Sequence, residues 1–136
     1  MTVKNVTERD LFAMVLGRII LMLREARGLN QGELGVAQSM VSRIERGTTT
    51  ADVWTVRRLG EALGEAHIYT LIDEVLGKAR DVTHVVVPSR KGKGPWWEAA
   101  VEASGRAGLE GLITFATADV LHEREAARRA KPGANT

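Results

Sequence analysis

Apolar residues recur at three- and four-residue steps between residues 11 and 23. They are Leu11, Phe12, Val15, Leu16, Ile19, Ile20 and Leu23, and this spacing predicts a helix with one wide apolar stripe. We expect the helix to begin after Thr7 and to end near Arg27, where Gly28 can take the left-handed conformation that often follows a helix. Residues 1–7 carry no such pattern, and we expect them to be loose.

A second helix is predicted to begin at Gln31, because Asn30 is a good N-cap. Gly35 interrupts it after one turn, and a short break leads into a third helix over about 38–46. Val41 and Ile44 lie at helical spacing and predict the buried face of that third helix. Gly47 ends it.

Two more helices follow at short intervals. Asp52 can cap the fourth, whose predicted core positions are Val53, Val56, Leu59 and Leu63. The fifth covers about 66–78 and buries Ile68, Leu71, Ile72, Val75 and Leu76. Five helices joined by short turns predict an all-α bundle over residues 8–80.

The C-terminal part is predicted to be mainly helical, with one short extended segment. Residues 83–88 (THVVVP) form that segment, which must pair with another segment, pair with another copy or act as a linker, because one strand alone is not stable. A helix is expected from Pro95, with Trp96 and Trp97 in its first turn. A longer helix follows over 109–129, with its stripe at Leu109, Leu112, Ile113, Ala116 and Val120. We expect residues 81–130 to form a second region and 131–136 a disordered tail.

Composition excludes several kinds of chemistry. The 136 residues include no cysteine, and the three histidines are scattered, so we expect no metal and no cofactor. No nucleophile, base and orienting group fall into a known catalytic motif, so we expect no enzymatic activity. The net charge of +2 is weak evidence for a nucleic-acid partner.

The longest apolar run, residues 11–23, is too short to cross a membrane, which takes about 20 apolar residues. The first ten residues lack a basic region followed by an apolar one. We therefore expect a protein that stays in the cytoplasm of a bacterial host, associated with the nucleoid.

Three segments of the chain resemble the phage-repressor (XRE-type) helix-turn-helix family. They read LGRIILMLREARGLNQGEL, VAQSMVSRIERG and DVWTVRRLGEALG, and the resemblance extends over about 16–76. It implies a transcriptional regulator, most often a repressor such as a phage immunity repressor, whose partner is double-stranded operator DNA. The third predicted helix would enter the major groove as the recognition helix.

Four outward positions on that helix are candidates for reading bases: Gln38, Ser39, Ser42 and Arg43. Short polar side chains and arginine can hydrogen-bond base edges in the major groove, and arginine bonds guanine through two atoms at once. In the resembled family a glutamine at the place of Gln38 reads adenine. An ordinary polar surface helix would show the same local pattern.

The resemblance also implies contacts away from the bases. Gln31, Arg46 and Thr48 match positions that contact phosphates. Arg24 and Glu45 match a largely buried salt bridge that holds the recognition helix in place without touching DNA.

The chain departs from the family between Gln31 and Gln38. About four residues are missing there, close to one helical turn of 3.6 residues, and we place the gap between Leu34 and Gly35. The loss of nearly a full turn keeps the apolar face in phase. It changes how the second helix crosses the DNA backbone.

The role of residues 81–130 stays open between three interpretations. They could serve for oligomerisation into a homodimer or for packing within the same chain, or make a second DNA contact through Arg90, Lys91 and Lys93. They could also bind a ligand or a partner protein, as in an antitoxin. For Arg57 and Arg58 on the fourth helix, a solvated face is favoured over a DNA contact.

Overall fold

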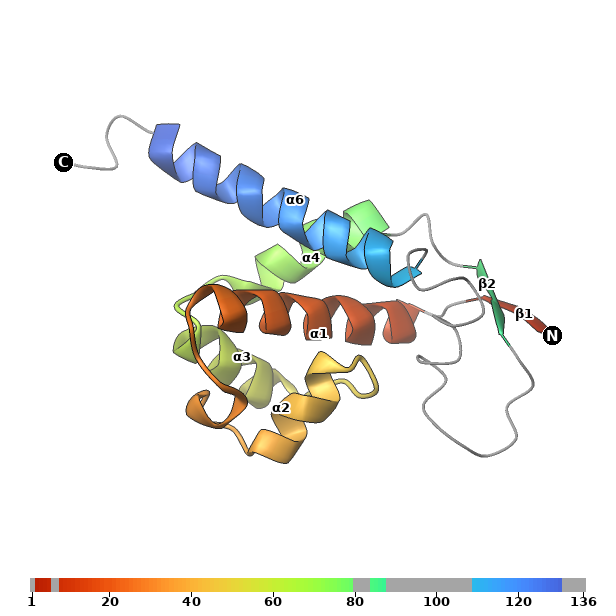
Figure 1. Ribbon diagram of the computed structural model, residues 1–136, viewed down its shortest axis with the longest axis horizontal. Coiled ribbons are helices and arrows are strands. Elements are labelled where there is room, and N and C mark those ends of the chain that lie inside the picture. Colours follow the sequence, from red (N-terminus) through yellow and green to blue (C-terminus); the bar gives the residue numbers. More distant parts are fainter. Residues whose placement is uncertain (1, 6–7, 80–83, 88–108, 131–136) are drawn as a thin grey trace.

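The computed structural model describes residues 2–5, 8–79, 84–87 and 109–130 (Figure 1). Within them lie five α-helices: α1 (Glu8–Ala26), α2 (Gln38–Glu45), α3 (Val53–Ala62), α4 (Ile68–Ala79) and α6 (Leu109–Ala130). A 3-10 turn, η1 (Gln31–Glu33), precedes α2, and two short strands, β1 (Thr2–Asn5) and β2 (His84–Val87), pair with each other. The all-α fold class predicted from the sequence is confirmed.

Helix α1 lies at the centre of the molecule. In Figure 1, α4 and α6 lie on one side of it and α2 and α3 on the other, and α1 contacts α2, α4 and α6. This position explains why its apolar stripe is so wide. The buried side chains of α1 are Leu11, Ala13, Met14, Val15, Leu16, Ile19, Ile20 and Leu23, and each large one contributes roughly 1.5–3 kcal/mol on burial.

The segment between α1 and α2 follows its predicted signals. Gly28 has a φ of +65°, and the side chain of Asn30 accepts a hydrogen bond from the backbone N–H of Gly32. The carboxylate of Glu33 accepts the N–H of Asn30 at 3.0 Å, which completes a capping box. The second helix of the predicted five is only this 3-10 turn. The turn ends at Glu33, two residues before Gly35, where φ is +72°. The position of the gap relative to the family stays a prediction.

Helices α3 and α4 complete the first bundle. The core position predicted for Val53 is wrong, because Val53 is 70% exposed at the start of α3, whereas Val56, Leu59 and Leu63 are buried. Asp52 caps α3 by accepting the N–H of Thr55 at 2.7 Å, as its position before an apolar repeat predicted. Gly64 has a φ of +70° in the turn that leads to α4. Helix α4 begins at Ile68, two residues later than expected, and buries all five of its predicted core residues.

The expectation that residues 1–7 are loose is wrong for residues 2–5. Strand β1 pairs antiparallel with β2, with Thr2 opposite Val87 and Asn5 opposite His84. The extended segment near residue 85 therefore pairs with another segment of the same chain. The sequence of β1 did not show this, because four residues are too few for an alternating pattern and the partner strand lies far along the chain.

Helix α6 packs against α1 and α4 and extends their core. Ile113, Ala116 and Val120 are buried, as their spacing predicted. Thr117 is also buried, and its hydroxyl donates to the carbonyl of Ile113 at 2.7 Å. The boundary expected near residue 80, the helix expected from Pro95 and the tail 131–136 lie outside the described residues and stay predictions.

Candidate nucleic-acid interface

Helix α2 has one buried face and one exposed face. Val41 and Ile44 are fully buried against α1. Gln38, Ser39 and Arg43 are exposed, and Ser42 is half-buried. Val41 and Ile44 are three residues apart in a helix of eight residues, so they share one face. The polar residues occupy the other face.

Gly17 allows α1 and α2 to approach very closely. A Cβ atom at this position would lie 2.2 Å from the carbonyl oxygen of Ile44 and 3.1 Å from that of Glu45. Both atoms belong to the backbone of α2 and cannot rotate away. This role of Gly17 was not predicted from the sequence, although a glycine inside an otherwise apolar helical run can indicate such an approach.

An ion pair joins the same two helices. Arg24 donates from Nε to Oε2 of Glu45 at 2.7 Å and from Nη2 to Oε1 at 3.0 Å. The side chains are 15% and 5% exposed. The hydrogen bonds to the carboxylate raise the pKa of Arg24 above its ordinary value, and its Nη1 donates to the carbonyl of Leu29. The pairing expected from the family resemblance is therefore present.

The side chain of Gln31 has a partner inside the protein. Its Nε2 donates to Oε1 of Glu45 at 2.9 Å, so Glu45 is held from α1 and from η1 together. One amide hydrogen of Gln31 is thereby used, and a second is left for a phosphate. This bond was not foreseen, because a glutamine at a helix N-terminus has many alternative partners.

The two other residues expected at phosphates also make contacts within the chain. Thr48 donates from its hydroxyl to the carbonyl of Arg43 at 3.0 Å, which closes the end of α2. That hydroxyl would have to leave Arg43 before it could donate to a phosphate. Arg46 is exposed and donates only from Nε, at 3.4 Å to the carbonyl of Ser42. Most of its guanidinium faces solvent.

The N-terminus of α2 is supported by a contact from another helix and not by a side-chain cap. Ala37, its N-cap residue, makes no side-chain capping bond. The loop before it is contacted from α3, where Nη2 of Arg58 donates to the carbonyl of Gly35 at 3.3 Å. The guanidinium of Arg58 also lies 5.9 Å from the ring centroid of Trp54.

The exposed face of α2 is open to a ligand. Among the residues that the structure describes, neither Gln38 nor Ser39 uses its side chain in a hydrogen bond, and Arg43 has no acidic partner. Other described arginines do pair with acids, for example Arg57 with Glu61 and Arg124 with Glu65. Arg90, Lys91 and Lys93, the expected accessory DNA contact, lie outside the described ranges.

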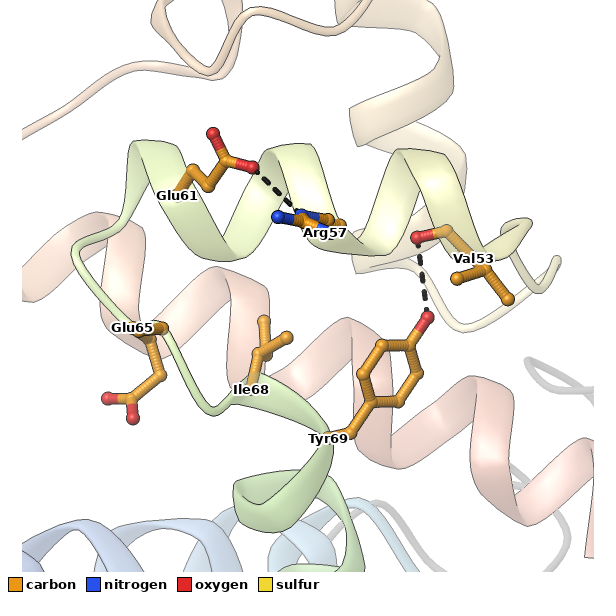
Figure 2. A pocket seen from close by; sticks show the side chains of 7 residues that line it. Val53, Arg57, Glu61, Glu65, Ile68 and Tyr69 are labelled. Carbon is orange, nitrogen blue, oxygen red and sulfur yellow. Dashed lines mark hydrogen bonds and ion pairs between the residues drawn. The ribbon is translucent and has the colours of Figure 1, made fainter.

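A hollow of about 450 Å³ lies between α3 and α4 (Figure 2). Val53 and Tyr69 line one end, where the hydroxyl of Tyr69 donates to the carbonyl of Val53 at 3.4 Å. Arg57 and Glu61 pair along its edge. Arg57 is therefore neutralised within the lining.

Comparison with known families adds one match. A family model described as helix-turn-helix matches residues 20–69, from the middle of α1 to the first turn of α4. This part of the chain is therefore similar to helix-turn-helix domains. The match covers less than half of the chain. The comparisons find no match among curated proteins or solved structures.

The helix-turn-helix domain implies DNA binding, and its family is typically not enzymatic. Within the matched segment, α2 follows the 3-10 turn η1. None of the described helices is long and apolar enough to cross a membrane.

Proposed function

We propose that the protein is a sequence-specific transcriptional regulator that inserts α2 into the major groove of double-stranded DNA. The observation that carries this proposal is the contrast between the two faces of α2. Its inner face is fixed by Val41, Ile44 and the Arg24–Glu45 pair, and its outer face carries polar side chains without partners in the described chain. A rigid helix with free donors and acceptors is what reading of base edges requires.

Each outward residue has a proposed role that follows from its chemistry. The guanidinium of Arg43 donates two hydrogen bonds to O6 and N7 of a guanine, and the amide of Gln38 pairs with an adenine. Ser39 and Ser42 bond neighbouring bases or phosphates. Arg46, Gln31 and Thr48 contact phosphates, the last two after adjustment of their internal bonds.

Repression by occlusion is the proposed mechanism. A protein held over a promoter by its recognition helix blocks access of the polymerase. A phage immunity repressor is one setting that fits this mechanism, and an integrase gene beside the coding sequence would support it. A toxin-like gene in that place would support the antitoxin alternative.

Selection of bound duplexes from a random pool, with the full chain, tests the proposal. We expect a defined site of high affinity. Arg43→Ala should select the same site with the preference at one guanine relaxed. Sequence-independent binding by the unchanged protein would contradict the proposal, and so would an unchanged preference in a folded Arg43→Ala variant.

The same experiment addresses symmetry. A homodimer would select two half-sites about one helical turn apart, related by a two-fold axis. A single copy with a second DNA contact in residues 81–130 would select an asymmetric site.

A further inference from the structure

Trp54 is a large aromatic side chain that the protein leaves in solvent. It occupies the second position of α3 and is 65% exposed. Its indole N–H donates to no acceptor in the part of the chain that the structure describes. Tryptophan combines a flat apolar face with one polar N–H, which makes it common at binding surfaces.

Arg58 connects Trp54 to the start of α2. Its guanidinium lies 5.9 Å from the centroid of the indole, within the usual range of a cation–π contact. The same guanidinium donates from Nη2 to the carbonyl of Gly35 at 3.3 Å. The two side chains therefore form one surface, which we call the Trp54–Arg58 patch.

Arg58 bonds the chain just before the first proposed base-reading residue. Gly35 precedes Gln38 by three residues, and three residues span at most about 11 Å. The major groove is about 12 Å wide, so phosphates border any helix inserted in it. When the first turn of α2 reads bases, the guanidinium of Arg58, which is bonded to Gly35, would thus lie beside the phosphates at the edge of the groove.

The local charge suits a phosphate. Arg58 is exposed and has no acidic partner among the residues described, whereas its neighbour Arg57 pairs with Glu61. The carboxylate of Asp52, two residues before Trp54, accepts the backbone N–H of Thr55. Arg58 keeps several N–H groups beyond the one bonded to Gly35, because a guanidinium carries five.

We infer that the Trp54–Arg58 patch is a second DNA contact, which binds the sugar-phosphate backbone beside the groove that α2 enters. Arg58 donates to a phosphate oxygen. The indole packs against the adjoining deoxyribose and donates its N–H to the same or the next phosphate. This inference rests on the proposed function and adds a contact on α3 to it.

Single methylphosphonate substitutions in the selected duplex provide the test. Each replaces one charged phosphate oxygen by a methyl group. We expect one position beside the site at which the substitution weakens the unchanged protein about tenfold but leaves Arg58→Ala unaffected. Arg58→Ala itself should bind the native duplex about tenfold more weakly, with a log–log salt slope smaller by about one.

Two variants of Trp54 separate the contribution of its aromatic face from that of its indole N–H. Trp54→Phe keeps an aromatic face but loses the N–H, and Trp54→Ala loses both, so we expect a graded loss of affinity. Phe115→Ala is the matched control, because Phe115 is 70% exposed on α6, across α1 from α2. Its affinity should be unchanged.

The outcomes distinguish this contact from simple support of the loop. If Arg58 only supports Gly35, Arg58→Ala will weaken binding and keep its sensitivity to every methylphosphonate, which overturns the inference. If Arg43→Ala relaxes one base while both α3 variants bind normally, the proposed function stands and the patch does not. If the unchanged protein selects no sequence, both fail.

Discussion

Arg24 and Glu45 join α1 to α2 through two parallel hydrogen bonds of 2.7 and 3.0 Å. Glu45 is the last residue of α2, so the pair fixes the C-terminal end of this helix to α1. Glu45 also accepts from Gln31, so loss of Arg24 would leave a nearly buried carboxylate with only a neutral partner. An uncompensated buried charge is costly.

Arg24→Ala should therefore lower the free energy of unfolding by about 3 kcal/mol. Urea unfolding followed by circular dichroism measures this. Arg57→Ala is the matched control, since its pair with Glu61 is exposed on both sides, and exposed pairs contribute at most about 1 kcal/mol. Equal stability of the two variants would show that the buried pair does not hold the domain.

Gly17→Ala should lower stability by about 2 kcal/mol and impair DNA binding, because its new Cβ collides with the backbone of α2 at Ile44. Gly77→Ala on α4 provides the control. A Cβ at Gly77 meets no atom within 4 Å, so this substitution should stabilise the protein by up to about 1 kcal/mol. Thermal unfolding and a DNA-binding assay on both variants check the prediction, which fails if Gly17→Ala binds DNA normally.

Gln38→Ala and Arg46→Ala should weaken DNA binding in different ways. Gln38→Ala should cost roughly 1–3 kcal/mol and relax the preference at one base pair. Arg46→Ala should weaken all sequences alike and reduce the salt slope by about one. Affinities on the selected site and on single-base variants, at several salt concentrations, separate the two. Identical profiles would mean that α2 does not lie in the groove as proposed.

Ile113→Ala should destabilise the helix-turn-helix domain itself, although residue 113 lies outside the matched segment. Its side chain is fully buried in the core shared with α1 and α4, and such truncations cost about 2–5 kcal/mol. Phe115→Ala, two residues away and exposed, should change stability by less than about 0.5 kcal/mol. Proteolysis within α2 at increasing urea concentration would report the effect. Unchanged protection would mean that α6 docks without supporting the domain.

Acid should weaken the start of α3. The hydrogen bond from the N–H of Thr55 lowers the pKa of Asp52 below its ordinary value. A carboxyl whose pKa is lower in the folded state stabilises the fold above its unfolded pKa and loses that effect as the pH falls through the folded one. Asp52→Asn keeps a capping side chain that does not titrate. Between pH 6 and pH 3, it should therefore lose less stability than the unchanged protein, and equal losses would contradict this role.

The helix caps and the buried stripes could be predicted from the sequence, because they depend on residues that are neighbours along the chain. Asn30 and Asp52 were recognised as caps from their positions before apolar repeats, and both make the expected bonds. The spacing of Ile113, Ala116 and Val120 predicted the buried stripe of α6, though not which helices it would cover. That the stripe packs on α1 and α4 depends on the path of the whole chain.

What the sequence did not predict depends on contacts between distant segments. Strand β1 exists only by pairing with β2. Gly17 is significant only because the carbonyl of Ile44 comes to lie over it. Gln31 and Arg58 are polar residues on predicted surfaces, and each has its partner in another element. The base-reading roles of Gln38, Ser39, Ser42 and Arg43 stay predictions until DNA is tested.

The separation of the two faces of α2 also has an evolutionary consequence. Folding depends on the inner face, whereas the proposed recognition uses three exposed side chains that make no hydrogen bond in the described chain. Substitutions at Gln38, Ser39 and Arg43 can therefore redirect the protein to a new operator at almost no cost in stability. Regulators with this fold can thus evolve different DNA specificities, and a few substitutions on one helical surface are enough for each change.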